Sequence, residues 1–154
     1  MKKDTQDYHS LCGALAFEAN RKAPEKSIKA HDGLQISFYE RDGFCPASLL
    51  LESFPGSNEK NAFVEDISGQ LLHDYKGIKP FCSRYVRDGI SEIRVEVPGG
   101  AILLFFFPFG NQIIITNGYR ENSGTDAEEA LDVAVRIENS YLKEVVNGQK
   151  QSQT

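Results

Sequence analysis

The chain has 154 residues, of which 40% are hydrophobic, so it is long enough for one domain with a substantial core and too short for two. Its formal net charge of -5 argues against a protein that coats nucleic acid non-specifically, although a local basic patch can still bind a phosphate-bearing partner. The three cysteines are widely spaced and show no zinc spacing, which favours a reduced cytoplasmic protein over a disulfide framework. We expect no metal, no other cofactor, no signal peptide and no membrane span.

The first 33 residues are polar and mixed in charge, so we expect a weakly ordered N-terminal extension there. Within it, residues 11–18 have the spacing of one short amphipathic helix, and residues 21–30 are typical of a linker. Alternating apolar residues from Leu34 to Phe38 then predict an edge-type strand, which ends at the turn signal of residues 41–43.

Two helices are expected after this strand. Pro46 suits the first turn of a short helix that stops at residues 55–56. Ser57 or Asn58 can cap a longer helix, which Gly77 ends. Its apolar residues recur at three- and four-residue steps, so the longer helix packs one stripe on the sheet; they are Ala62, Phe63, Ile67, Leu71 and Tyr75.

A basic, irregular connection is expected over residues 76–89, and it leads into a three-stranded antiparallel meander over residues 89–119. The first strand of the meander alternates between apolar and charged residues, as a half-buried strand does. The next two strands, at residues 101–107 and 113–116, are apolar at successive positions. Both of their faces are therefore expected to be covered, which makes them central strands.

A final helix is expected to close the domain over one face of the sheet. Thr125 is a suitable cap, and Glu128, three residues later, completes a capping box. The predicted fold is α+β, with an extension at residues 1–33, a domain at residues 34–146 and a disordered tail at residues 147–154. The order within the domain is one strand, two helices, a three-stranded antiparallel meander and a helix packed on the sheet.

The charges are segregated along the chain. Between residues 76 and 94 five cationic side chains stand against two acidic ones, whereas between residues 125 and 146 two cationic side chains stand against six acidic ones. A solvated face is the ordinary explanation of either run.

The element order and several motifs resemble the RelE/HigB superfamily of bacterial toxins, most of all its phage-derived, HigB-like branch. In that branch a strand ends in an aromatic residue and a turn with Gly and Pro, as residues 38–46 (FYERDGFCP) do here. A basic stretch and an Asp-Gly followed by Glu-Leu-Arg come next, matched by residues 87–94 (RDGISEIR). Residues 103–107 and 113–119 match the two strands that follow, so the resemblance covers roughly residues 34–142.

The resemblance implies a toxin of a type II toxin-antitoxin system, namely a metal-independent endoribonuclease that cuts mRNA on the ribosome. Its implied partners are a helix-turn-helix antitoxin protein, the ribosome and mRNA, with no direct DNA contact and no membrane. Such a site needs a base for the 2'-hydroxyl proton, cations for the crowded phosphorane and an acid for the leaving oxygen. Arginine suits the cationic role because its planar fork stays charged and binds phosphate oxygens in pairs.

Carried onto this sequence, the resemblance assigns the catalytic roles to Arg94, Tyr119 and Arg120. It assigns RNA binding to the basic stretch that contains Lys79, Arg84 and Arg87. Each assignment has an alternative. Arg94 can pair with Glu92 or Glu96 on its own strand face, Tyr119 can cap the sheet, and the other cations can be solvated. His73 is a lone helix histidine and receives no role.

The chain departs from the family at two points. Residues 101–104 (AILL) stand where relatives carry a second arginine, and Glu121-Asn122 stand where relatives carry a lysine pair. Each lost cation removes about 3 kcal/mol of transition-state stabilisation.

Two functions therefore stay open. The first is a HigB-like toxin, weakened or differently specialised, and the second is a non-catalytic protein-binding module that uses the sheet and the acidic last helix. Convergence of the four arginines and Tyr119 on one concave face would favour the first. Scatter, or pairing with Glu92, Glu96 and Glu121, would favour the second. Inhibition of gyrase, as by ParE-type relatives, has no specific support.

Overall fold

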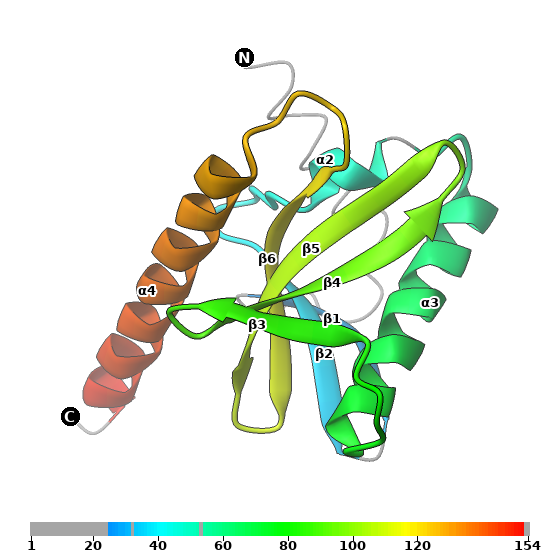
Figure 1. The fold of residues 1–154 in the computed structure, drawn as a ribbon. Helices are drawn as coiled ribbons and strands as arrows, with labels where there is room; N and C mark the ends of the chain where they lie inside the picture. The colour runs from blue at the N-terminus through cyan, green and yellow to red at the C-terminus, as the bar shows by residue number, and fades with distance from the viewer. Residues whose placement is uncertain (1–24, 32, 53, 153–154) are drawn as a thin grey trace.

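The computed structural model describes residues 25–31, 33–52 and 54–152. They form an α+β domain around one six-stranded mixed sheet with the strand order β1-β2-β6-β5-β4-β3 (Figure 1). Strands β2 and β6 run parallel, and every other neighbouring pair is antiparallel. The elements are β1 (Glu25–His31), β2 (Leu34–Tyr39), α2 (Ser48–Leu51), α3 (Ser57–Tyr75), β3 (Ser83–Arg87), β4 (Ile90–Val97), β5 (Gly100–Phe109), β6 (Gln112–Arg120) and α4 (Ala127–Ser152).

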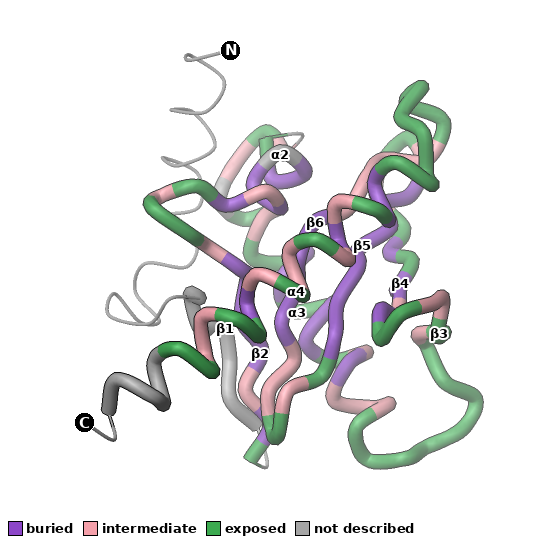
Figure 2. Tube along the Cα trace, turned by 90° about the vertical axis from the view of Figure 1, so that its left-hand side faces the viewer, coloured by how far each residue is buried: buried purple, intermediate pink, exposed green. Residues whose placement is uncertain are grey.

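The sheet is covered on both faces, with α2 and α3 on one side and α4 on the other (Figure 1). Strand β5 shows why the apolar run is continuous: Leu104 and Phe106 pack under α3, whereas Phe105 and Phe107 pack under α4. Strands β5 and β6 are accordingly the most continuously buried part of the chain trace (Figure 2). The predicted antiparallel meander and its two central strands are confirmed.

Two strands occupy segments for which the sequence predicted irregular structure. Strand β1 lies in the expected linker and pairs with β2, so β2 is an inner strand and not an edge strand. Strand β3 lies in the expected basic connection and pairs with β4, which extends the meander to four strands. Both strands are short and weakly apolar, and it is pairing with a neighbour that stabilises them. The expected helix at residues 11–18 lies outside the described residues.

The helix ends also differ from the prediction. Helix α3 begins after Gly56, whose backbone is extended, and no side chain caps it, so neither Ser57 nor Asn58 has the expected role. At α4, Asp126 and not Thr125 accepts the hydrogen bond from the backbone N–H of Glu128, at 2.9 Å. Asp is as good a cap as Thr, and its charge suits a helix N-terminus.

Helix α4 extends to Ser152, past the expected domain end at residue 146. A buried amide anchors it to the sheet: Asn117 donates to the backbone oxygen of Ala130 at 2.9 Å and accepts from the Thr116 hydroxyl at 2.8 Å. Thr116 lies at an irregularity in the β5–β6 pairing, so the irregularity turns this side-chain pair toward the helix. Among the described helices, none combines the length and the apolar character that crossing a bilayer requires.

Candidate functional site

The predicted catalytic residues lie where β4, β5 and β6 align. Arg94 pairs in register with Leu103, which pairs with Tyr119. Directly opposed residues of antiparallel strands share one face, so Arg94 and Tyr119 lie on the α4 side of the sheet. We call this surface the charged face; its polar residues are Arg84, Glu92, Arg94, Glu96, Tyr119 and Glu121.

Arg94 is held between two carboxylates on the charged face. Its Nη2 and Nε donate to Glu121 at 2.9 and 3.3 Å, and its Nη1 contacts Glu96. The hydrogen bonds that Arg94 donates to Glu121 and Glu96 raise the pKa of Arg94, and Arg94 in turn lowers the pKa of Glu121. The donor fork that would bind a phosphate is therefore occupied.

Arg84 and Tyr119 have local roles on the same face. Arg84 Nε donates to Glu92 at 2.6 Å across the β3–β4 pair. The Tyr119 ring packs on Phe105 with 6.0 Å between ring centroids. Burial, then the charges of Glu92 and Glu121, raise the pKa of Tyr119 above its ordinary value. A raised pKa makes the phenol a poorer base at neutral pH, so packing on the sheet is its evident role.

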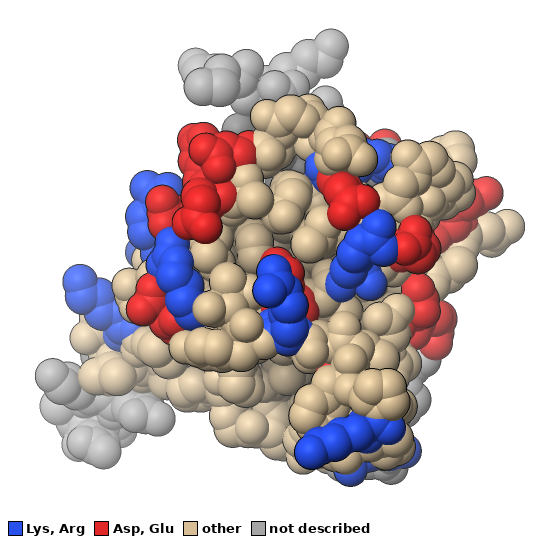
Figure 3. Space-filling model, in the orientation of Figure 1, with Lys and Arg blue, Asp and Glu red and all other residues tan. Residues whose placement is uncertain are grey.

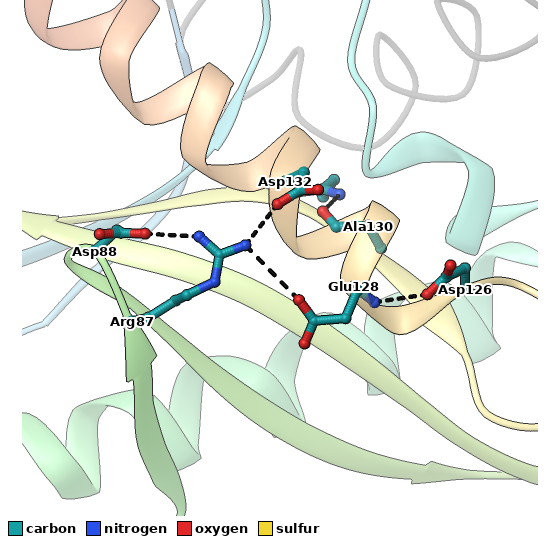
Figure 4. A network of polar contacts seen from close by, with 7 residues as sticks. Arg87, Asp88, Asp126, Glu128, Ala130 and Asp132 are labelled. Atoms are coloured by element: carbon teal, nitrogen blue, oxygen red, sulfur yellow. Dashed lines mark hydrogen bonds and ion pairs between the residues drawn. The ribbon is translucent and has the colours of Figure 1, made fainter.

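Arg87 lies on the α4 side of the sheet but is directed at α4, whereas Arg120 lies on the opposite face. Arg87 joins the β3–β4 turn to the start of α4, because its guanidinium bonds Asp88 at 2.6 Å and Asp132 at 2.5 Å (Figure 4). Arg120 is paired with Ile102, which packs in the core beneath α3, so its side chain lies on the opposite face. There its Nη2 donates to the Pro98 carbonyl at 2.9 Å.

The predicted cations therefore do not form one basic surface. On the face that carries β3, β4 and α4, Lys and Arg side chains lie beside Asp and Glu side chains (Figure 3). Lys79 lies in the loop after α3, with its Nζ 6.0 Å from the centroid of the Phe81 ring. Of the five residues expected to converge, Arg84, Arg94 and Tyr119 share the charged face, Arg87 lies on the same side of the sheet but is held by acidic residues of α4, and Arg120 lies on the opposite face.

A second surface, not predicted from the sequence, lies where α3 leads into β3. Four large apolar side chains are between 48% and 66% exposed there, in a segment that also carries Lys76 and Lys79. The sequence did carry a sign of this surface, namely aromatic and aliphatic residues inside a polar, basic segment. We call this surface the loop edge; its apolar residues are Tyr75, Ile78, Phe81 and Tyr85.

Asp74 holds the loop edge in place. Its carboxylate accepts hydrogen bonds from the backbone N–H groups of Cys82 and Ser83, at 2.7 and 2.8 Å, and from the Ser83 hydroxyl at 2.5 Å. Burial opposes ionisation, but the hydrogen bonds from Ser83 and Cys82 outweigh it and lower the pKa of Asp74. Partial burial and the Asp74 carboxylate raise the pKa of the exposed Cys82 thiol, so this thiol is not an activated nucleophile. Within the described residues, the donors grouped closely enough for a metal ion are those of His73, Asp74 and Cys82.

A groove of about 310 Å³ lies on the opposite face of the sheet, between α3 and β4. Phe63 and Val95 line it, together with the carboxyl-bearing residues Glu59 and Asp66 of α3. Acidic side chains repel phosphate, so the groove does not suit RNA.

No protein-family model, no curated protein and no solved structure matches this chain. Its function is therefore argued from the residues and contacts described above.

Proposed function

We propose that the chain is a non-catalytic protein-binding module that takes up an extended segment of a partner protein along β3. The observation that carries the proposal is the loop edge, where four large apolar side chains are exposed within residues 75–85, before and within a strand at the end of the described sheet. Exposed apolar residues gathered in one region favour an interaction surface, whereas scattered single ones do not. Tyr85 belongs to β3 itself, and Phe81 precedes that strand by two residues.

The edge of β3 suits recognition of an extended strand. Among the described strands β3 has one neighbour, β4, so its other edge presents backbone N–H and C=O groups in register for a further strand. In this mode of binding, backbone hydrogen bonds supply affinity and side-chain pockets supply specificity. Tyr85 and Phe81 would supply the apolar contacts.

The charge of the segment indicates the chemistry of the partner. Lys76 and Lys79 are the cationic residues of the loop edge, and residues 76–87 include no acidic one. Arg84 and Arg87 of the same segment are paired with Glu92 and Asp132 and are not counted here. A partner segment that alternates apolar residues with Asp or Glu complements this surface, while a second basic copy of the same edge is repelled. An acidic, extended part of a helix-turn-helix antitoxin, the partner implied by the resemblance, would fit this description.

The RelE-like scaffold remains part of the proposal. One strand, two helices, three antiparallel strands and a final helix occur in the expected order, with β1 and β3 added at the two ends of the sheet. This order supports a RelE-like arrangement as an interpretation of the α+β fold. It supports no activity, since one fold hosts many functions.

A ribosome-dependent endoribonuclease is the second candidate. It is favoured by the shared face of Arg84, Arg94 and Tyr119, which lie on adjoining strands. It is disfavoured by the carboxylates that bind both arginines, since a phosphate must first displace Glu92 from Arg84 and Glu121 from Arg94. A binding role requires no such displacement.

A peptide-display selection tests the binding role. The native chain, a Phe81→Ser, Tyr85→Ser double variant and a Leu142→Ser control are each used as bait for a library of random linear peptides. Leu142 is an exposed apolar residue of α4, so the control also tests the acidic helix as the binding surface. We expect peptides with alternating apolar and acidic residues on the native chain and the control, and their loss from the double variant.

Induced expression in a bacterium separates the two candidates. We expect no growth arrest from the native chain and none from Arg94→Ala. Arrest that disappears in a folded Arg94→Ala variant, or peptides that bind the double variant as well as the native chain, would contradict the binding role on the loop edge.

A further inference from the structure

Three side chains with different metal-binding atoms meet where α3 ends. His73 and Asp74 are adjacent in the last turn of α3, and the loop returns Cys82 to them just before β3. His73 Nδ1, an Asp74 carboxylate oxygen and Cys82 Sγ all lie within 4.8 Å of one another. The two backbone hydrogen bonds to Asp74 fix the approach of the loop, so this grouping is a property of the folded turn.

The separations of these atoms are those of ligands around one small cation. Tetrahedral zinc bonds of about 2.3 Å to sulfur and about 2.0 Å to nitrogen or oxygen place S and N about 3.5 Å apart, and N and O about 3.3 Å apart. In the structure Cys82 Sγ lies 3.6 Å from His73 Nδ1, and His73 Nδ1 lies 3.3 Å from Asp74 Oδ1.

Without a metal ion, protons occupy the space between these atoms. His73 Nδ1–H can donate to Asp74 Oδ1, and the Cys82 thiol is hydrogen-bonded to Asp74 as well. A cation can replace these protons, because each of the three atoms can contribute one lone pair to it.

We infer that His73, Asp74 and Cys82 bind a divalent zinc ion. A thiolate, an imidazole and a carboxylate form a donor set typical of zinc, and three protein ligands leave the fourth position to water or to a partner's side chain. Binding releases the thiol proton of Cys82 to solvent and keeps the imidazole proton on Nε2. Asp74 Oδ2 stays hydrogen-bonded to Ser83, which orients the carboxylate as outer-shell partners of metal ligands do.

This inference is independent of the protein-binding role, although the two sites share a loop. A bound ion would tie the end of α3 to the start of β3 and hold the exposed Ile78 and Phe81 in one arrangement. No zinc motif is visible in the sequence because the ligands are two neighbouring residues and a single cysteine eight residues after Asp74, and the folded turn brings them together.

Cobalt substitution and zinc competition test the site in the full, reduced chain. Co²⁺ is titrated into the native protein while the thiolate-to-cobalt charge-transfer absorption is followed, and Zn²⁺ is then added to displace it. The ligand variants are Cys82→Ser and His73→Gln. Asp74 is left unchanged because it also holds the loop. The control is a His9→Gln, Cys12→Ser double variant, since these residues are the other His and Cys that are close in sequence.

We expect one saturable charge-transfer band in the native chain and the control, and its loss in Cys82→Ser. Zinc affinity should fall at least about a hundredfold in both ligand variants, since even changes to outer-shell partners cost about 10- to 100-fold. Circular dichroism without metal should be the same for all of these chains, because Cys82 is exposed. No saturable band in the native chain, an equal band in Cys82→Ser, or a band lost only in the control would overturn the inference.

Discussion

The charged face and the loop edge lie next to each other along the β3–β4 hairpin, and both reach solvent, yet their side chains are used in opposite ways. On the charged face Arg94 meets Glu121 and Arg84 meets Glu92, so the donors of each guanidinium are directed at a carboxylate. On the loop edge apolar rings stay exposed beside lysines. A cationic side chain is therefore available to bind a ligand only where a neighbouring strand does not supply a carboxylate that pairs with it.

The two surfaces also differ in what supports them. The charged face lies on β3 to β6, of which β5 is the most continuously buried, and packs beside α4. The loop edge depends on a single partly buried carboxylate, that of Asp74.

The largest effect is expected at Gly118, directly beside Tyr119 in β6. A Cβ atom at this position would collide with the backbone oxygen of Leu103 and press on Leu50. Gly118→Ala should lower the free energy of unfolding by about 3 kcal/mol, measured by urea denaturation. Gly69→Ala is the control: it lies on the exposed side of α3 with open space around it and should leave stability unchanged or raise it by about 0.5–1 kcal/mol. Equal changes in stability for the two variants would show that the sheet around residue 118 can adjust to an added methyl group.

Loss of the Asp74 carboxylate should have the next largest effect, confined to the loop edge. Asp74→Ala removes three hydrogen bonds to a charged group and should cost about 2 kcal/mol of stability. Hydrogen exchange should speed up at the amides of Cys82 and Ser83 while β5 stays protected. Asp66→Ala, an exposed change on the same helix, should neither lower stability nor speed hydrogen exchange in the loop. Unaltered exchange at Cys82 in Asp74→Ala would show that other contacts hold the loop.

Reversal of one charge should give the charged face an affinity for RNA. Glu121→Lys releases Nη2 and Nε of Arg94, whose Nη1 still contacts Glu96, and adds a cation beside them. We expect binding of a single-stranded RNA oligonucleotide to rise about tenfold at low salt and the gain to vanish at high salt. Glu129→Lys makes the same charge change on the exposed side of α4. If that control gains as much, net charge and not the Arg94 pair governs binding.

The smallest effect is the pH dependence of the Arg94–Glu121 pair. Arg94 lowers the pKa of Glu121 in the folded state, so the folded protein releases this proton more readily than the unfolded chain does. The contribution of the pair is therefore present above the unfolded pKa of Glu121 and is lost as the pH falls through the lower folded value. The difference in melting temperature between the native chain and Glu121→Gln should shrink on acidification. A difference in melting temperature that grows on acidification would contradict this prediction. Because both side chains are exposed, added salt should also reduce the difference in melting temperature.

Part of the fold was predictable because the pattern of apolar residues is a local property. Alternation over β2 and β4, continuous apolar residues over β5, and helical spacing over α3 and α4 each identified an element correctly. Strands β1 and β3 were missed because a short, polar segment becomes a strand only when a neighbour completes its hydrogen bonds. Helix caps were misassigned because several suitable residues stand next to one another, as Thr125 and Asp126 do.

The candidate site was less predictable. The sequence placed Arg94 and Tyr119 on strands and also offered the pairing of Arg94 with its own-strand neighbours as an alternative. It did not offer Glu121, 27 residues away, as the main partner. The grouping of His73, Asp74 and Cys82 was likewise invisible, because it depends on the path of a loop.

The sequence alone determined most of the buried positions and their period, since transfer of apolar side chains from water favours any fold that hides them on one stripe or on alternate positions. Ala62 and Tyr75, expected on the packed stripe of α3, are exposed. It also determined where the chain turns. Only the tertiary structure decided which charges neutralise one another, because electrostatic and hydrogen-bond contacts act over a few ångströms between residues far apart in the chain. The sequence therefore identified the cationic residues. Strand register and the packing of α4 determined that they pair with Glu92, Asp132 and Glu121.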